Sequence, residues 1–152
     1  MNCIYKLRFE KSSYDLEKDY EKLSEYQKEK IANMKPASFF DFNDEQFKYT
    51  LYMIISPIDI KNYVSILDIN QIGYELDDIS DAALKDEIEL DDYLMKQSNR
   101  SNRTKIINFI EKKNEWVYEN LDIDTVLDRI SEVGMESLRY IEKKFLQNYH
   151  ID

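Results

Sequence analysis

The fold of this chain is decided by residues 47–79, which have the sequence FKYTLYMIISPIDIKNYVSILDINQIGYELDDI. The run from Phe47 to Ile55 is almost continuously apolar, which is typical of a strand buried on both faces. Ser56 is a good N-cap and Pro57 suits the first position of a helix. The segment from Tyr74 to Ile79 has the composition of another strand. Strand, short helix and strand predict a right-handed crossover between parallel neighbouring strands.

The helix inside this stretch has apolar residues at the positions i, i+3, i+4 and i+7, occupied by Ile60, Tyr63, Val64 and Leu67. This spacing places all four on one face of a helix. Ile55 and Ile60 are placed to form a hydrophobic staple across its start. Asn70 to Gly73 ends the helix.

The residues before this stretch predict one more strand and one long helix. Ile4 to Phe9 is a short, largely apolar strand. Ser12 or Ser13 caps a helix that we expect to run to about Met34, because Pro36 disfavours helix in the residue before it.

Ala37 to Glu45 is expected to be a loop that brings Phe39, Phe40 and Phe42 close together. Exposed aromatic side chains can anchor a partner. The alternative is that they fold back over the sheet as core, which large apolar side chains usually do.

After Ser80 the pattern is helical to the end of the chain. We expect helices over residues 81–97 and 104–119. A further helix carries the apolar quartet Ile123, Val126, Leu127 and Ile130 and ends with a C-cap at Gly134, and a last helix starts at Ser137. In that last hairpin Leu127 and Phe145 should face each other or the body beneath. The polar residues 98–103 are the best candidate for a mobile connection.

The predicted fold class is α+β. It has a small three-stranded, at least partly parallel sheet with packed helices, and an all-helical C-terminal half. We place the α+β part at residues 1–97 and the helical part at residues 98–152, packed together as one domain.

The final helices resemble a known tail in the sequence Val126-Leu127-Asp128-Arg129-Ile130-Ser131, then Gly134, Glu136-Ser137-Leu138 and Glu142-Lys143-Lys144-Phe145-Leu146. Residues 123–149 are similar to a C-terminal helical tail of unknown function in some bacterial rhomboid-family proteins and small Bacteroidetes proteins. Tyr140 stands where that tail usually has an acidic residue. The resemblance implies a helical hairpin and a bacterial source, and it does not extend to the N-terminal part.

Composition excludes several classes of function. The net charge of −10 argues against direct nucleic-acid binding, which requires Lys and Arg to neutralise phosphates. Cys3 is the only cysteine and His150 the only histidine, so the chain can form neither an internal disulfide nor a catalytic pair of two histidines nor a histidine-rich metal cluster. Residues 49–58, the longest uncharged apolar run, are too short for a membrane span. We expect a cytoplasmic protein without a cofactor.

Acidic residues are concentrated in one stretch, residues 75–92. It contains nine carboxylates and a single base, Lys85, whereas residues 96–113 contain six bases and one acid, Glu111. An acidic surface of this kind attracts a basic partner. The alternative is a solvated face, which runs of charge usually form, or internal pairing with the basic segment. The predicted partner-binding residues are Asp77, Asp78, Asp81, Asp86, Glu87, Glu89, Asp91 and Asp92.

These carboxylates do not predict chemistry. They lack the alternating ligands and the loop glycine of a calcium site, so we expect no metal site. We predict no catalytic residues, because a carboxylate pair needs a cleft that the sequence does not specify.

The predicted function is binding to a protein with a basic surface. An immunity- or antitoxin-type inhibitor of a toxic enzyme fits this description. A phage or mobile-element inhibitor that mimics nucleic acid, and an enzyme of unknown reaction with a carboxylate-based site, remain as alternatives. The partner's identity and the oligomeric state stay open.

Overall fold

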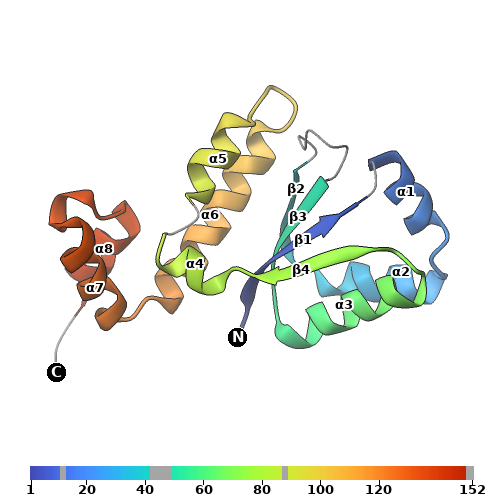
Figure 1. Ribbon diagram of the computed structural model, residues 1–152, viewed down its shortest axis with the longest axis horizontal. Helices are drawn as coiled ribbons and strands as arrows, with labels where there is room; N and C mark the ends of the chain where they lie inside the picture. Colours follow the sequence, from blue (N-terminus) through green and yellow to red (C-terminus); the bar gives the residue numbers. More distant parts are fainter. Residues whose placement is uncertain (11–12, 42–48, 87–88, 150–152) are drawn as a thin grey trace. The chain divides into compact units, whose positions relative to one another are not determined.

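The computed structural model describes residues 1–10, 13–41, 49–86 and 89–149 of the chain. The chain divides into two compact units, Met1–Ser80 and Asp81–Asp152 (Figure 1). Residues 81–97, which we expected in the first part, belong to the helical second unit.

In the described part of the first unit, four strands form one antiparallel sheet, which three helices accompany. The elements in chain order are β1 (Cys3–Phe9), α1 (Ser13–Glu21), α2 (Glu25–Met34), β2 (Ala37–Asp41), β3 (Tyr49–Ile55), α3 (Pro57–Ile69) and β4 (Tyr74–Asp78). The strand order is β2-β3-β1-β4, and every neighbouring pair is antiparallel. The α+β class is confirmed, with one strand more than we expected.

The predicted parallel pairing between β3 and β4 is wrong. Both strands are antiparallel to β1, so they run in the same direction, but β1 lies between them. With α1 and α2 in the first crossover and α3 in the second, this is the split, ferredoxin-like βαββαβ arrangement. The burial of the strands explains the order. Ile4, Leu7 and Phe9 of β1 are fully buried, whereas Glu75 and Asp77 of β4 are exposed, and charged side chains suit an edge strand.

Strand β2 replaces the first part of the predicted aromatic loop. Phe39 lies opposite Tyr52 of β3 and is 6% exposed, whereas the next residue, Phe40, is 38% exposed. Phe39 is therefore a core residue, as the alternative interpretation had it. Phe42 lies outside the described residues. A strand of five residues at a sheet edge gives too short an alternation to distinguish it from a loop.

The long helix predicted up to Met34 is two helices. The break lies at Ser24, which is the N-cap of the second helix. Its side chain accepts a hydrogen bond from the backbone N–H of Gln27 (3.1 Å). The side chain of Gln27 accepts one from the backbone N–H of Ser24 in return (3.1 Å). This reciprocal pair is a capping box, which starts α2 at Glu25.

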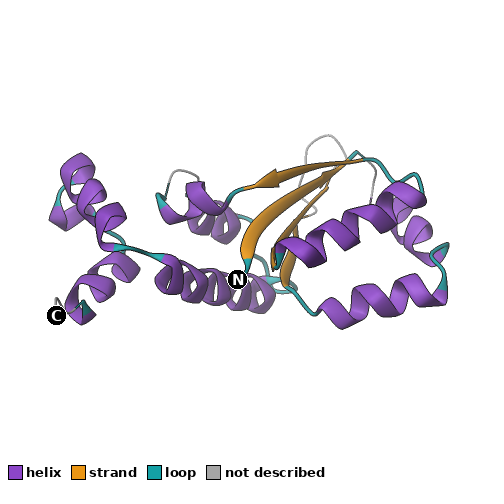
Figure 2. Ribbon diagram, turned by 90° about the horizontal axis from the view of Figure 1, so that it is seen from below, coloured by secondary structure: helices purple, strands orange, loops and turns teal. Residues whose placement is uncertain are grey.

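The core of the first unit lies between one face of the sheet and its helices (Figure 2). Leu16 of α1 and Tyr63 and Leu67 of α3 pack against side chains of β1 and β3. The start of α3 is as predicted: Ser56 Oγ accepts a hydrogen bond from the backbone N–H of Asp59 (3.1 Å). All seven residues of β3 are buried, which confirms a strand buried on both faces.

The described part of the second unit is helical. Its elements are α4 (Ser80–Leu84), α5 (Leu90–Lys96), α6 (Arg103–Asn120), α7 (Ile123–Val133), the 3-10 turn η1 (Met135–Ser137) and α8 (Tyr140–Asn148). The single helix expected over residues 81–97 is interrupted, because Asp86 (φ 58°) and Glu89 (φ 42°) adopt left-handed backbone conformations. Such residues cannot continue a right-handed helix.

The polar connection between α5 and α6 is a closed turn. The side chain of Asn99 accepts hydrogen bonds from the backbone N–H groups of Ser101 (2.9 Å) and Asn102 (3.1 Å). Asn102 Oδ1 accepts one from the backbone N–H of Asn99 (2.7 Å). Side chains therefore satisfy much of the backbone here.

The last helices differ from their prediction in two details. Residues 135–137 form η1, so α8 begins at Tyr140 rather than Ser137. Leu127 is 49% exposed. Phe145 packs instead against the rings of Tyr118 and Tyr149, at centroid distances of 6.3 and 5.7 Å.

Candidate functional site

The predicted acidic surface is divided between the two units. Asp77 and Asp78 belong to the edge strand β4, whereas Asp81, Asp86 and the acids from Glu89 onwards belong to the helical unit. Glu87 lies outside the described residues. The acids that are close together in the sequence therefore lie on several secondary-structure elements and do not form one surface on a single element.

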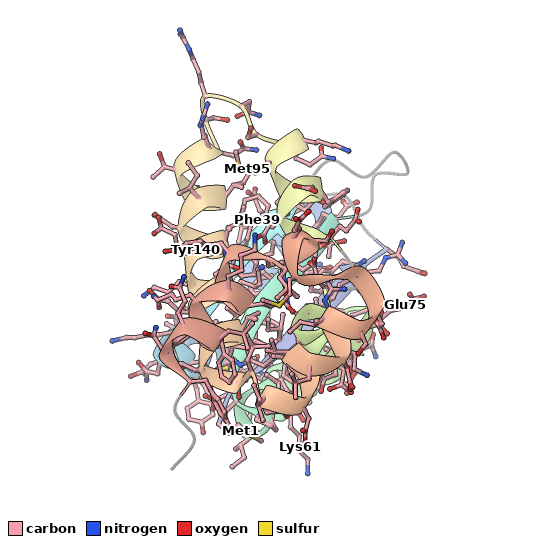
Figure 3. The ribbon with its side chains drawn as sticks, turned by 90° about the vertical axis from the view of Figure 1, so that its left-hand side faces the viewer. Met1, Phe39, Lys61, Glu75, Met95 and Tyr140 are labelled. Atoms are coloured by element: carbon pink, nitrogen blue, oxygen red, sulfur yellow. The ribbon has the colours of Figure 1, made fainter. Side chains whose placement is uncertain are left out.

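The acids of β4 face bases on the neighbouring strand. In the register of β1 and β4, Asp77 lies opposite Lys6 and Glu75, labelled in Figure 3, lies opposite Arg8. Opposite charges at such positions compensate each other. Asp78 caps the following turn, because its Oδ1 accepts a hydrogen bond from the backbone N–H of Ser80 (2.9 Å). These acids have roles within the fold.

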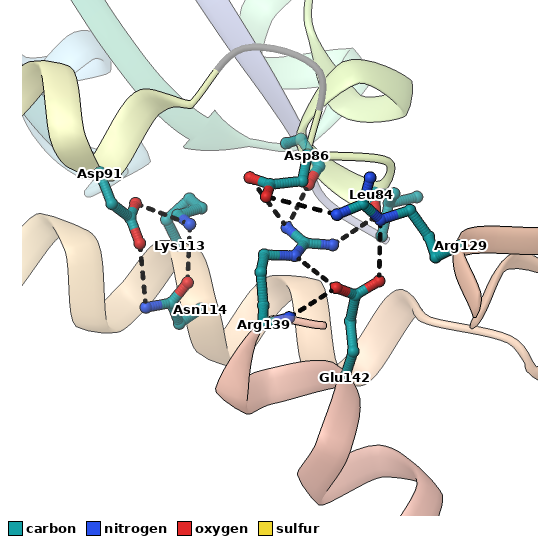
Figure 4. Close-up of polar contacts among 9 residues, drawn as sticks. Leu84, Asp86, Asp91, Lys113, Asn114, Arg129, Arg139 and Glu142 are labelled. Atoms are coloured by element: carbon teal, nitrogen blue, oxygen red, sulfur yellow. Dashed lines mark hydrogen bonds and ion pairs between the residues drawn. The ribbon is translucent and has the colours of Figure 1, made fainter. Parts of the chain in front are cut away.

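Asp86 belongs to a buried ionic network (Figure 4). Its carboxylate is 3.6 Å from an amino nitrogen of Arg129 and 3.8 Å from one of Arg139. Both arginines also reach Glu142, Arg139 through Nε at 3.1 Å and Arg129 through Nε at 3.4 Å. Two acids and two arginines, from the α4–α5 connection and from α7 and α8, thus neutralise one another.

Glu142 is the centre of this network. It is 0% exposed, and an ionised carboxylate at such a position requires charged partners. Arg139 has further acceptors in the carbonyl oxygens of Ala83 (2.8 Å) and Leu84 (2.6 Å) at the end of α4. The arginine thereby ties the start of α8 to the end of α4.

Burial raises the pKa of the Asp86 carboxyl above its ordinary value, although Arg139, Arg129 and Lys113 lower it. Desolvation disfavours the charged form, and together with repulsion from the nearby Glu142 carboxylate it outweighs the three cations. The ionised form of Asp86, which pairs with the two arginines, is therefore less favourable here than it would be in water.

Asp91 is also paired internally. Its Oδ1 is 2.7 Å from Nζ of Lys113, which is 5% exposed. Lys113 also donates to Asn114 Oδ1 (2.6 Å). Asp91 is therefore paired with the basic segment, through Lys113, as that alternative had it. Asp86 is also paired within the chain, but with Arg129 and Arg139, which lie outside the basic segment.

The remaining predicted site residues of the second unit are solvent-facing. Asp81, Glu89 and Asp92 are exposed, and none of them has an ion pair with a residue in the described ranges. They are available to a partner, although they are scattered over α4 and the start of α5.

A groove of about 630 Å³ lies between α6 and α8, beside the start of α5. Its lining includes four carboxylates, those of Asp91, Glu111, Glu115 and Glu119. We refer to these four residues as the acidic row and to the hollow as the acidic groove.

The three glutamates of the acidic row are four residues apart along α6. This spacing puts them on one face of the helix, about 6 Å apart along its axis. Glu115 is 3.6 Å from Lys112, but both side chains are more than half exposed, so this pair contributes little. No described residue forms an ion pair with Glu111 or Glu119.

The opposite wall of the groove comes from α8. Tyr140, labelled in Figure 3, is 81% exposed at its rim. Lys144 extends from α8 towards α6, where its Nζ is 5.1 Å from the centre of the Tyr118 ring. Carboxylates, tyrosine rings and an open shape can hold an extended cationic group.

Sequence reasoning identified Asp91 but not the rest of the acidic row. Glu111 was counted within a segment that is basic overall, and Glu115 and Glu119 follow that segment. The signal in the sequence was their spacing of four residues on the helix predicted over residues 104–119, which places them on one face. Counting charge along the chain combines residues from all faces of a helix, so it does not reveal that one face is acidic.

Within the described ranges, no group of three or more His, Cys, Asp or Glu side chains could hold a metal ion. In the same ranges, no helix combines the length and the apolar character needed to cross a membrane. No family model, no curated protein and no solved structure matches the chain.

Proposed function

We propose that the chain is a protein-binding protein that takes a basic segment of another protein into the acidic groove. The observation that supports this most directly is the row of Glu111, Glu115 and Glu119 on one wall of the groove. Like charges four residues apart destabilise a helix. A bound cationic segment would relieve that repulsion, whereas water alone only screens it.

The other charges of the groove also favour the binding of a cationic segment. Arg139 is already bound to Glu142 and to two backbone carbonyls, so it offers little compensation to the glutamates. Asp91 adds a fourth carboxylate to the lining, but Lys113 compensates its charge, so the three glutamates carry the free negative charge. The net charge of −10 would in addition speed encounter with a basic partner.

Within this class we propose an immunity- or antitoxin-type inhibitor in the bacterial cytoplasm. Such a protein acts by covering a surface of a toxic enzyme, and it needs a binding face of complementary charge rather than a reaction centre. The small size and acidic composition of the chain support this choice, and the acidic groove supplies the face.

The test is binding of fluorescein-labelled nona-arginine, followed by fluorescence anisotropy at two salt concentrations. The first variant is Glu111→Gln, Glu115→Gln, Glu119→Gln. The matched control is Glu75→Gln, Asp77→Asn, Asp78→Asn on β4, which changes the net charge by the same amount. Circular dichroism checks that both variants remain folded.

We expect the groove variant to bind about tenfold more weakly, because three exposed charge pairs at about 0.5 kcal/mol each sum to about 1.5 kcal/mol. Its salt dependence should be shallower, and the β4 variant should remain close to the parent protein. Equal losses in both variants would show that the peptide senses only the overall charge, and the proposal would then fail.

A further inference from the structure

The ring of Tyr118 is held in place by residues of α8. Asn148 Nδ2 donates a hydrogen bond to the hydroxyl of Tyr118 (3.2 Å). The ring of Phe145 meets the Tyr118 ring nearly edge-on, at an interplanar angle of 74°. Lys144 places its ammonium group over the ring, 5.1 Å from the centre. A tyrosine fixed in this way presents a defined face to a cation.

Lys144 is the cation of the groove that can move. Arg139, the other base in the lining, is bound to Glu142, Ala83 and Leu84. Lys144 is exposed, and it has no ion pair with any residue in the described part of the chain. Its flexible four-carbon stem allows the ammonium group to leave the ring without disturbing α8.

We propose that Lys144 is a built-in competitor, which occupies the place on Tyr118 that a cationic side chain of the partner takes on binding. This inference rests on the proposed function, since it names the chemistry that the acidic groove recognises. The preferred occupant is an arginine. Its planar guanidinium stacks on an aromatic face, and its several N–H donors can reach neighbouring carboxylates at the same time.

The consequence is a preference that neither the acids nor the net charge would produce alone. A lysine from a partner gains little by replacing Lys144, because both are ammonium groups on the same ring. An arginine gains the stacking and the additional hydrogen bonds. The internal lysine thereby discriminates against weakly matched basic segments.

The test compares Lys144→Met with Lys143→Met in the full chain, using labelled nona-arginine and nona-lysine as probes. Both substitutions remove one positive charge from α8. Lys144 lines the groove, whereas Lys143 does not and, among the described residues, donates to the backbone carbonyl of Glu136 (3.4 Å). Each substitution is also made together with Tyr118→Phe, which keeps the ring, and with Tyr118→Leu, which removes it.

We expect Lys144→Met to bind nona-arginine about two- to fivefold more tightly than Lys143→Met, the range of one exposed cation–π contact. Tyr118→Phe should keep this difference and Tyr118→Leu should remove it. The parent protein should prefer nona-arginine to nona-lysine. Tighter binding by Lys144→Met when the parent protein fails to bind would also support the competitor.

Equal affinities of the Lys143 and Lys144 variants would overturn the inference. So would a difference that survives Tyr118→Leu, because it would then be a general charge effect. In either case the comparison of glutamate variants still decides the proposed function by itself. Failure of every variant to bind either peptide would remove both proposals.

Discussion

Arg139 and Glu142 are joined twice at the start of α8. The backbone N–H of Arg139 and its side-chain Nε both donate to Glu142 Oε1, at 3.0 and 3.1 Å. One carboxylate oxygen therefore caps the helix and also holds the arginine that reaches the end of α4. The first turn of α8, which carries one wall of the acidic groove, is positioned by this pair.

The Glu142→Gln substitution should strongly destabilise the protein. It leaves Arg129 and Arg139 partly buried without their shared counter-charge, and breaking a buried ion pair typically costs about 3–5 kcal/mol. Urea denaturation measures the change in the free energy of unfolding. Glu136→Gln, at an exposed position in η1, is the control and should have little effect. A loss below about 1 kcal/mol for Glu142→Gln would show that Asp86 alone satisfies both arginines.

The raised pKa of Asp86 predicts an unusual pH dependence. When the pH rises above 3.8, the ordinary pKa of an aspartate, the Asp86 carboxyl keeps its proton in the folded protein but releases it in the unfolded chain. This contribution to the free energy of unfolding is therefore present at low pH, and it decreases as the pH rises through the raised pKa. Asp86→Asn removes the titration, and Asn tolerates the positive φ of 58° at this position.

The measurement compares urea denaturation of Asp86→Asn and the parent protein at about pH 4 and about pH 7. We expect the variant to gain stability relative to the parent protein as the pH rises. Asp92→Asn, an exposed neighbour, should show no such trend. The opposite trend would mean that the arginines, rather than burial, control the pKa of Asp86.

Gly134→Ala should destabilise the turn between α7 and η1. Gly134 has φ 82° and ψ 160°, a region in which side chains cost about 1–3 kcal/mol. Nothing lies within 4 Å of a Cβ added there, so the cost is one of backbone conformation. Gly73→Ala is the control. A Cβ at Gly73 also has no atom within 4 Å, but the φ of Gly73 lies outside the left-handed region, so the thermal midpoint of this variant should change little. Equal shifts in the two variants would contradict this interpretation.

Ser24→Ala should cost about 0.5–2 kcal/mol, the usual effect of losing an N-cap. The substitution removes the acceptor for the backbone N–H of Gln27 at the start of α2. Ser65→Ala is a suitable control, because its hydroxyl bonds to the carbonyl of Lys61 inside α3, where alanine is the better helix former. A thermal melt that shows no loss for Ser24→Ala would imply that Gln27 alone maintains the cap.

Local signals predicted the elements of the fold well and their arrangement poorly. Ser56, Pro57 and the four apolar residues after them were sufficient to identify α3. They also gave the common direction of β3 and β4. They could not reveal that β1, some forty residues earlier, enters between these strands, because pairing depends on which strand can be buried most completely. The capping box at Ser24 was readable in the sequence, but the apolar spacing across it obscured the break.

Of the candidate site, the sequence predicted only the negative charge and not the residues that form it. Charge counting indicated an acidic surface, yet Asp86 and Asp91 are paired internally and the β4 acids face bases across the sheet. Arg129 and Arg139, the partners of Asp86, lie about fifty residues away in the chain, where no local pattern connects them to it. The face of α6 that carries the three glutamates of the acidic row becomes a groove wall only because α8 lies opposite, which the sequence does not show.

The complete burial of β3 has a consequence for misfolding. Its sequence, YTLYMII, has no charge, no proline and no glycine, which is the composition of a segment prone to form amyloid. In the native sheet both of its edges are occupied, by β1 on one side and β2 on the other. Strand β2 has only five residues and lies at the edge of the sheet, so its detachment would expose one edge of β3. We therefore expect β2, which the sequence predicts to be a loop, to protect β3 from pairing with strands of other molecules.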